Sequence, residues 1–430
     1  MPRVLLLLPA TTYRGEAFLE AAHRLKLDVT VASDEAIPQP SQQLKDFLHL
    51  PLHDFKDSVR TVVGFSRQHP FDVVIGVDDR TATLAAHIAS ALGLPHNSAE
   101  SVEAAHNKHR MRQLLHEQGV PVPRFAVWGL DVNPAALAGT ISFPCVVKPL
   151  ILSASCGVIR ANNPEEFVAA FERVGALLRQ LGLAPTDEAG RQLLVEEFVP
   201  GREVAVEGLL TNGELRVLAL FDKPDPLDGP FFEETIYVTP SRLPASLQSE
   251  IASCGARAAR ALGLREGPVH GECRINDRGV WVIELAARSI GGRCSQTLRF
   301  AAGLSLEELI LRHAFRMELP ALDQVGQAAG VMMLPIPDRG IFSGVRGQTA
   351  ARAVPGIEEL EITALPGEPL VPLPEGTRYL GFMIARGDTP EFVEAALREA
   401  HRHLDVVISA TRAGAPRDEV PGTGRRVVRF

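Results

Sequence analysis

Two glutamates, Glu272 and Glu284, lie on strand-like segments that the sequence predicts to form a β-hairpin. The segments Val269–Ile275 and Val280–Leu285 flank a turn, and Asp277–Gly279 suits a three-residue loop that ends on a left-handed glycine. In that register the two glutamates face each other, with Cβ atoms about 5 Å apart. Facing carboxylates repel unless a cation lies between them, and Mg²⁺ prefers oxygen ligands. The hairpin is therefore a candidate metal site; a solvent-facing surface with incidental charges is the alternative.

A lysine lies inside an otherwise apolar segment. Phe143–Pro149 reads FPCVVKP, which predicts a buried strand that carries the charge of Lys148. A buried ammonium group costs free energy unless it faces an anion. The loop that follows contains Ser153, Ser155 and Gly157, and such small residues can surround phosphates with backbone N–H groups and hydroxyls. A surface turn would have a similar composition, but the preceding lysine favours a phosphate site.

The N-terminal part must place further polar groups. Val4–Leu8, Leu27–Ala32 and Asp72–Val77 have the composition of buried strands and alternate with helical patterns, which predicts a doubly wound parallel sheet. Asp78 and Asp79 directly follow the third of these strands, at the edge where open α/β sheets bind ligands. Capping of the next helix is the alternative interpretation. The first strand is not followed by the glycine pattern of a dinucleotide site.

Composition limits the class of protein. The chain has 430 residues, 46% of them hydrophobic and 22% charged, which is typical of a globular protein with two to four domains. The formal charge of −8 offers no basic field for nucleic acid. Five scattered cysteines without a CxxC pair indicate a reducing compartment and no zinc site. The initial apolar segment is interpreted as a strand, and no segment predicts a membrane span. We therefore expect a cytoplasmic enzyme.

The order of the motifs resembles that of a known family. Asn107-Lys108, FPCVVKP, the Ser/Gly loop, VEEFVPGREV and IELAAR together resemble the ATP-grasp carboxylate–amine ligases, and most of all the bacterial L-amino acid ligases. The resemblance implies a mixed α/β and α+β fold of ATP-grasp architecture. It has an N-terminal doubly wound, Rossmann-like domain (1–104), a two-lobed ATP-grasp domain (105–320) and a C-terminal α+β domain (321–430).

The resemblance also implies a nucleotide site. Two lysines would bind the ATP phosphates beneath the Ser/Gly loop. One glutamate of the VEEFVPGREV segment would accept a hydrogen bond from the adenine amino group, and another would bind the ribose. The implied phosphate-binding residues are Lys108, Lys148, Ser153, Ser155 and Gly157. Glu196 and the backbone of Glu197 and Val199 would bind adenine, and Glu203 would bind the ribose.

The remaining roles concern the metal and the reaction. The resemblance makes Glu272 and Glu284 the ligands of Mg²⁺, for which Mn²⁺ can substitute, in agreement with the hairpin register. Arg288 and Lys148 become the catalytic residues. Expected substrate contacts are Glu234, His270, Arg288, Gly291 and Gly292, although a structural role is the alternative for His270.

The implied reaction joins a carboxylate to an amine through an acyl phosphate and releases ADP and phosphate, and amino acids are the expected substrates. Many family members have an asparagine at the position of Ala286, and alanine cannot bind a metal. This departure keeps open a nucleotide-binding regulatory or scaffold protein, and a carboxyphosphate-forming carboxylase is the alternative enzyme. The expected partners are small carboxylates and amines. A homodimer is one expectation, because family members are often dimers.

Overall fold

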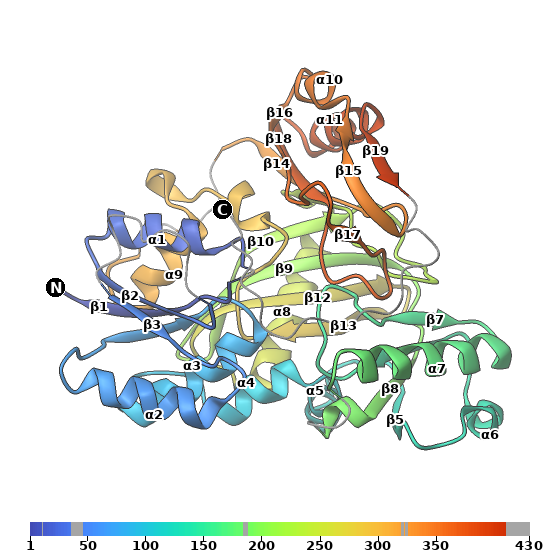
Figure 1. Cartoon of the computed structure of the whole chain (residues 1–430), viewed down its shortest axis with the longest axis horizontal. Coiled ribbons are helices and arrows are strands. Elements are labelled where there is room, and N and C mark those ends of the chain that lie inside the picture. The colour runs from blue at the N-terminus through green and yellow to red at the C-terminus, as the bar shows by residue number, and fades with distance from the viewer. Residues whose placement is uncertain (11, 36–45, 184–187, 320–321, 323–325, 410–430) are drawn as a thin grey trace.

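The computed structural model describes the chain except for residues 11, 36–45, 184–187, 320–321, 323–325 and 410–430 (Figure 1). The described part contains four β-sheets with helices packed against them. This mixture of a parallel sheet, antiparallel sheets and helices confirms the predicted fold class. None of the helices in the described ranges is long and apolar enough to cross a membrane.

The first unit is a parallel sheet with helices on both faces. Its elements are β1 (Arg3–Leu7), α1 (Gly15–Arg24), β2 (Asp28–Ser33), β3 (Asp46–His49), α2 (Phe55–Ser66), β4 (Val73–Gly76), α3 (Asp79–Leu92) and α4 (Ala99–His106). The strands lie in the order β3-β2-β1-β4. Leu5 and Leu7 pack with α2 and α3, whereas Val4 and Leu6 pack with α1. Because successive strand residues point to opposite faces, this division confirms the predicted doubly wound arrangement.

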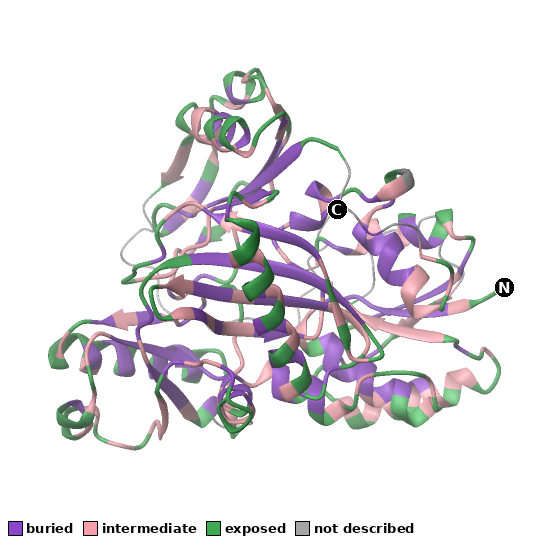
Figure 2. Ribbon diagram, turned by 180° about the vertical axis from the view of Figure 1, so that it is seen from behind, coloured by how far each residue is buried: buried purple, intermediate pink, exposed green. Residues whose placement is uncertain are grey.

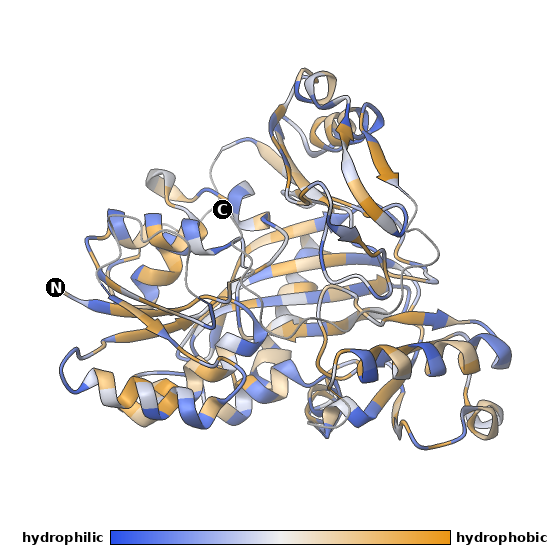
Figure 3. Ribbon diagram, viewed as in Figure 1, coloured by the Kyte–Doolittle hydropathy of each residue, from blue (hydrophilic) through white to orange (hydrophobic). Residues whose placement is uncertain are grey.

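A second, antiparallel sheet forms what we call the small lobe. After α5 (Lys108–Glu117) come β5 (Phe125–Gly129), α6 (Pro134–Leu137), β6 (Cys145–Pro149), β7 (Ile159–Ala161), α7 (Pro164–Gln180) and β8 (Gln192–Glu197). The strand order is β5-β8-β6-β7, and α7 covers one face with Phe167, Phe171 and Leu178. Hydrophilic residues colour the outer side of α7 blue in Figure 3.

The largest sheet joins the central and C-terminal parts. It contains β9 (Arg202–Thr211), β10 (Glu214–Lys223), β11 (Ile236–Thr239), β12 (Gly267–Asn276), β13 (Gly279–Ala286), β14 (Ala328–Leu334), β16 (Ile357–Ile362) and β18 (Gly381–Gly387). Their order is β13-β12-β9-β10-β11-β14-β18-β16. One face packs against α8 (Ala245–Ala261), whose exposed outer side runs across the sheet in Figure 2. The opposite face packs against α1 and α9 (Leu306–Ala314). Polar residues on the same sheet line part of a cavity between this sheet and the two other units.

The C-terminal part adds a small sheet of its own. Its elements are β15 (Gly340–Arg346), α10 (Gln348–Arg352), β17 (Pro369–Leu370), α11 (Pro390–Arg402) and β19 (Asp405–Ser409). The strand order is β17-β15-β19, and α11 packs against β14 and β18 of the large sheet. The predicted domain boundaries stay predictions, but the large sheet runs across the one between residues 320 and 321.

The hairpin confirms one expectation and corrects another. Glu272 lies directly opposite Glu284, as predicted. The predicted three-residue loop is wrong, because Asn276 pairs with Gly279 and only two residues form the turn. A β-bulge between Glu272 and Cys273 leaves Ile283 without a partner in the ladder and restores the predicted alignment.

Candidate active site

A cavity of about 430 Å³ lies between the parallel sheet, the small lobe and the large sheet. Nearly all of the residues selected from the sequence line it. They are Lys108, Lys148, Ser153, Ser155, Glu196, Glu197, Val199, Glu203, Glu234, His270, Glu272, Glu284, Arg288, Gly291 and Gly292. Within the described chain the exception is Gly157, which belongs to the same loop but donates its N–H to the carbonyl of Pro374, 2.8 Å away. Residues separated by more than 180 positions therefore share one cavity.

A buried cluster marks one end of the cavity. Lys148 on β6 forms an ion pair with Glu196 on the neighbouring strand β8. Arg112 of α5 contacts the same carboxylate through Nε at 2.5 Å and also donates to the carbonyl of Ile283, 2.6 Å away. Burial lowers the pKa of the Lys148 ammonium. Burial alone would raise the pKa of Glu196, but Arg112 and Lys148 keep it below the usual range. The lysine thus has an anionic partner, as its place in an apolar strand predicts.

Lys108 connects the Ser/Gly loop to the hairpin. Its Nζ donates to the carbonyl of Leu152, 2.7 Å away, and lies 3.4 Å from Glu284 Oε1. The side chain of Asn107 caps the helix that carries this lysine by accepting hydrogen bonds from two backbone N–H groups. In the loop that Lys108 contacts, Ala154 and Ser155 have φ angles of +53° and +54°, an uncommon conformation for residues with side chains. An anion in the cavity would meet both the ammonium and this loop.

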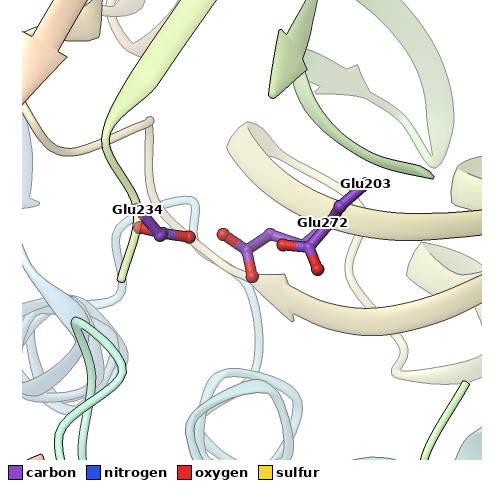
Figure 4. A group of neighbouring side chains, drawn as sticks. All are labelled: Glu203, Glu234 and Glu272. Carbon is purple, nitrogen blue, oxygen red and sulfur yellow. The ribbon is translucent and has the colours of Figure 1, made fainter. Parts of the chain in front are cut away.

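Three carboxylates converge near the centre of the cavity. Glu203 of β9, Glu234 and Glu272 of β12 offer oxygen atoms that all lie within 4.8 Å of one another (Figure 4). Lys223, at the end of β10, contacts all three with its Nζ, at 2.8, 2.6 and 2.8 Å respectively. Although burial opposes the charged form, the three carboxylates raise the pKa of Lys223 well above its usual range. Arg274 adds a second cation, with Nε 2.9 Å from Glu203 Oε2.

The facing pair on the hairpin fits a hard cation. Glu272 uses one oxygen for Lys223, and Glu284 has one oxygen near Lys108 and a side chain that is 25% exposed. A carboxylate offers about four acceptor sites on its two oxygens, more than these lysine contacts use, and oxygen donors are the ligands that Mg²⁺ prefers. The side chain of the buried Ala286, two residues after Glu284, adds no oxygen donor to this pair.

His270 lies behind the metal-ligand candidate Glu272. Its Nε2 is 3.8 Å from Glu272 Oε1, and its Nδ1 is 3.9 Å from Oε2 of the fully buried Glu207. Burial lowers the pKa of His270 and raises that of Glu207 well above its usual value. Among the described side chains, His270 Nδ1 and Glu207 Oε1 are buried polar atoms without a hydrogen-bond partner. His270 therefore lines the cavity and lies between two carboxyl groups, with one ring nitrogen that has no partner in the described structure.

Arg288 is oriented by the N-terminal unit. Its Nε and Nη2 lie 2.9 and 3.0 Å from the two carboxylate oxygens of Asp79, the first residue of α3. The adjacent Asp78 caps that helix, since its Oδ1 accepts a hydrogen bond from Thr81 N at 2.8 Å. The two aspartates thus have different roles. Asp78 caps the helix, and Asp79 contacts the site residue Arg288. Burial would raise the pKa of Asp79, but Arg288 lowers it to about 2.

The glycine segment next to Arg288 also contacts the N-terminal unit. The N–H of Gly292 donates to the hydroxyl of Tyr13, and Gly292 has φ +60°. Arg14 donates to the carbonyl of Ser289 at 3.1 Å. The cavity lining also includes Tyr13 next to Gly291, Met333 next to Gly292, and the two further tyrosines Tyr237 and Tyr379. This end of the cavity therefore combines aromatic surface with polar groups.

Several site residues are absent from the sequence predictions: Tyr13, Arg14, Arg112, Lys223 and Arg274. For Lys223 a signal exists, because it ends the apolar segment LALFDK, much as Lys148 lies near the end of FPCVVKP. Each of the other four contacts at least one residue more than 70 positions away, and no local pattern identifies that partner.

Replacing Glu234 with glutamine is expected to change how stability depends on pH. Burial, aided by the neighbouring Glu272, raises the pKa of Glu234 to about 8 from 4.5. A carboxyl group whose pKa is raised on folding contributes its full stability below 4.5, and that contribution is lost as the pH rises towards 8. Between pH 5 and about pH 8 wild type should therefore lose unfolding free energy relative to Glu234→Gln. Urea titrations of both proteins, with the exposed Glu391→Gln as control, measure this; parallel curves would contradict it.

Three parts of the chain match models of known protein families. Residues 141–297 match the ATP-grasp domain, residues 19–96 the ATP-grasp N-terminal domain, and residues 332–409 the L-amino acid ligase C-terminal domain 2. The crystal structure of L-amino acid ligase from Bacillus licheniformis is similar with a TM-score of 0.84 and 25% identity, over 95% of this chain and 99% of that chain.

Two proteins known by sequence are also similar to this chain. An uncharacterised protein of Sinorhizobium fredii is 24% identical over 95% of this chain and 84% of its own length. Alanine–anticapsin ligase of Bacillus subtilis is 25% identical over 60% of this chain. The alignment spans 56% of that ligase.

Proposed function

We propose, from the premise that this chain is an ATP-grasp carboxylate–amine ligase, that it couples an amino acid to a second amine-bearing molecule at the expense of ATP. The observation that supports this proposal is the cavity shared by Lys108, Lys148, the facing Glu272–Glu284 pair and Arg288. These groups supply cations and metal-ligand oxygens together, which is what a triphosphate with its counter-ion requires.

The nucleotide would lie between the small lobe and the hairpin. Lys108 and Lys148 would bind phosphate oxygens, and Ser153 and Ser155 would cover them with hydroxyl and N–H groups. Glu196 has room for the adenine amino group because a carboxylate can accept about four hydrogen bonds, and Arg112 and Lys148 use only part of that capacity. Glu203 would bind the ribose with the oxygen capacity that Lys223 and Arg274 leave. Glu272 and Glu284 would hold Mg²⁺, which neutralises phosphate charge when bound.

The reaction would take place beside Arg288. An oxygen of the substrate carboxylate attacks the γ-phosphorus, the bond from phosphorus to the bridging oxygen breaks, and ADP leaves. The amine nitrogen then attacks the carbonyl carbon of the acyl phosphate, loses a proton and displaces inorganic phosphate. Arg288 donates through Nε and Nη2 to Asp79 and through Nη1 to the carbonyl of Ser289, which leaves one N–H on Nη1 and one on Nη2 to donate to the phosphoryl oxygens as charge develops on them. No nucleophile of the protein is needed.

An isotope experiment tests this order of bonds. Pairs of amino acids are first screened for release of ADP and phosphate, and the active acid is then supplied with ¹⁸O in its carboxylate. We expect ADP as the nucleotide product and ¹⁸O in inorganic phosphate, because the carboxylate oxygen stays with the transferred phosphorus. Label in AMP, with release of pyrophosphate, would contradict the proposal. Turnover that requires bicarbonate would instead favour the carboxylase, and absence of any nucleotide turnover would favour the regulatory protein.

A further inference from the structure

A segment of the C-terminal part, Val371–Tyr379, contacts the small lobe at two points. The N–H of Gly157 donates to the carbonyl of Pro374 at 2.8 Å. Arg173 of α7 forms a two-pronged ion pair with Glu375, with Nε–Oε1 and Nη2–Oε2 distances of 2.6 and 3.0 Å. One contact is made by the last residue of the Ser/Gly loop, and the other by the helix α7 of the same lobe.

The turn that presents these groups is tightly built. The N–H of Gly376 donates to the carbonyl of Pro372 at 2.9 Å. A Cβ atom at Gly376 would lie 2.3 Å from the carbonyl oxygen of Val371, so the turn requires glycine there. Arg339 supports Glu375 from within the C-terminal part, at 3.5 Å. The carboxylate is therefore already in place for Arg173, with its side chain 21% exposed.

The same segment continues into the wall of the cavity. Thr377 and Tyr379 line the cavity, only two and four residues after Glu375. A narrow space beside the segment is lined by Ala154 of the loop together with Leu373. One short piece of chain thus connects the contact at Gly157 with two residues of the cavity wall.

We propose that Glu375 is a positioning residue that holds the Ser153–Gly157 loop closed over the phosphates of a bound nucleoside triphosphate. This inference rests on the proposed function, because it assumes that the loop covers ATP. The ion pair fixes α7, the hydrogen bond to Pro374 fixes Gly157, and together they determine where the loop ends. The same turn leads directly into Thr377 and Tyr379 of the cavity wall.

The test uses the full chain and two measurements. Hydrogen exchange of the Gly157 amide, followed without nucleotide, reports on the contact with Pro374. Calorimetric binding of the β,γ-imido analogue of ATP with Mg²⁺ reports on the closed loop. The variants are Glu375→Gln, Arg173→Gln and the double variant. The matched control is Glu358→Gln, which removes a surface ion pair with Arg386 of 2.8 Å in the large sheet.

We expect Glu375→Gln to exchange Gly157 about three- to fivefold faster and to bind the analogue about three- to fivefold more weakly, with an unchanged unfolding midpoint, as loss of a partly exposed ion pair allows. Arg173→Gln should match it. The effect of the double variant should fall well short of the sum of the two single effects, because all three variants lose the same Arg173–Glu375 ion pair and differ only in the contacts of Glu375 with Arg339 and of Arg173 with the Phe231 ring. Glu358→Gln should behave as wild type.

Equal exchange and equal binding in Glu375→Gln and the control would overturn the inference. Additive effects of the two single variants would also overturn it, since the residues would then act separately. Failure of wild type to bind the analogue would contradict the proposed function itself. These results are distinguishable, because the exchange of Gly157 is read without nucleotide.

Discussion

Glu272→Gln and Glu284→Gln are each expected to lower the rate of ADP formation by about 10²–10³-fold, the usual cost of losing one group that stabilises developing charge. Glutamine keeps the shape of the side chain and removes the negative charge that would hold Mg²⁺. Turnover is measured at saturating ATP and Mg²⁺ with the amino-acid pair found by the screen. Excess Mn²⁺ should restore part of the activity if metal binding is what the variants lose.

The two variants should differ in stability although their activities fall together. Glu272 is one of three carboxylates around the buried Lys223, whereas the Glu284 side chain is 25% exposed and 3.4 Å from Lys108. We expect Glu272→Gln to lower the unfolding free energy without metal by about 1–3 kcal/mol. Glu284→Gln should change it by less than about 1 kcal/mol.

Denaturant titrations in the presence of a chelator measure these differences, with Glu391→Gln as an exposed control outside the cavity. Full activity in both variants would rule out the metal role of the facing pair. Global unfolding of both would show that the pair is part of the core.

Local patterns account for only part of the alignment of Glu272 with Glu284. Strand alternation and turn composition bring Glu272 and Glu284 to one face of a hairpin. The turn is one residue shorter than predicted, and the bulge at Ile283 restores the alignment. Arg112 binds the carbonyl of Ile283, and Val282 donates to the carbonyl of Pro121 at 3.2 Å. The bulge is therefore stabilised by distant residues that no local pattern identifies.

The compensating charges are the main part of the site that local patterns miss. The sequence indicates that facing carboxylates need a cation, and the structure supplies Lys223 to one and Lys108 to the other. Lys223 reaches the cluster because β10 pairs with β9 in a register that sets it opposite Glu203. A register between two strands depends on the whole sheet, whereas a lysine in an apolar segment can be recognised within a few residues. Lys223 could therefore be recognised in LALFDK as Lys148 is in FPCVVKP, but the three carboxylates that it contacts could not.

Changes at Arg288 and at its partner Asp79 should separate catalysis from nucleotide binding. Arg288→Lys should lower turnover by about 10²–10³-fold, since lysine cannot make two parallel hydrogen bonds to a phosphoryl group. Asp79→Asn should lower it by about tenfold to a hundredfold, because the arginine keeps its charge but loses the carboxylate that orients it. Binding of the ATP analogue should change by less than about threefold in both, because the lysines carry most of the phosphate contact.

Stability against pH gives an independent readout for Asp79. Its pKa is lowered from 3.8 to about 2, so its contribution to stability is fully present above pH 3.8 and is lost as the pH falls through 2. Asp79→Asn should therefore cost on the order of 2 kcal/mol at neutral pH and flatten the acid limb of the stability curve between about pH 4 and 2. Asp78→Asn is the matched control, because asparagine also caps helices and Asp78 does not contact Arg288 in the described structure.

If Asp79→Asn weakened analogue binding as much as turnover, Arg288 would be a ground-state phosphate ligand. If it left turnover unchanged, the Asp79–Arg288 pair would serve only to join the N-terminal unit to the large sheet.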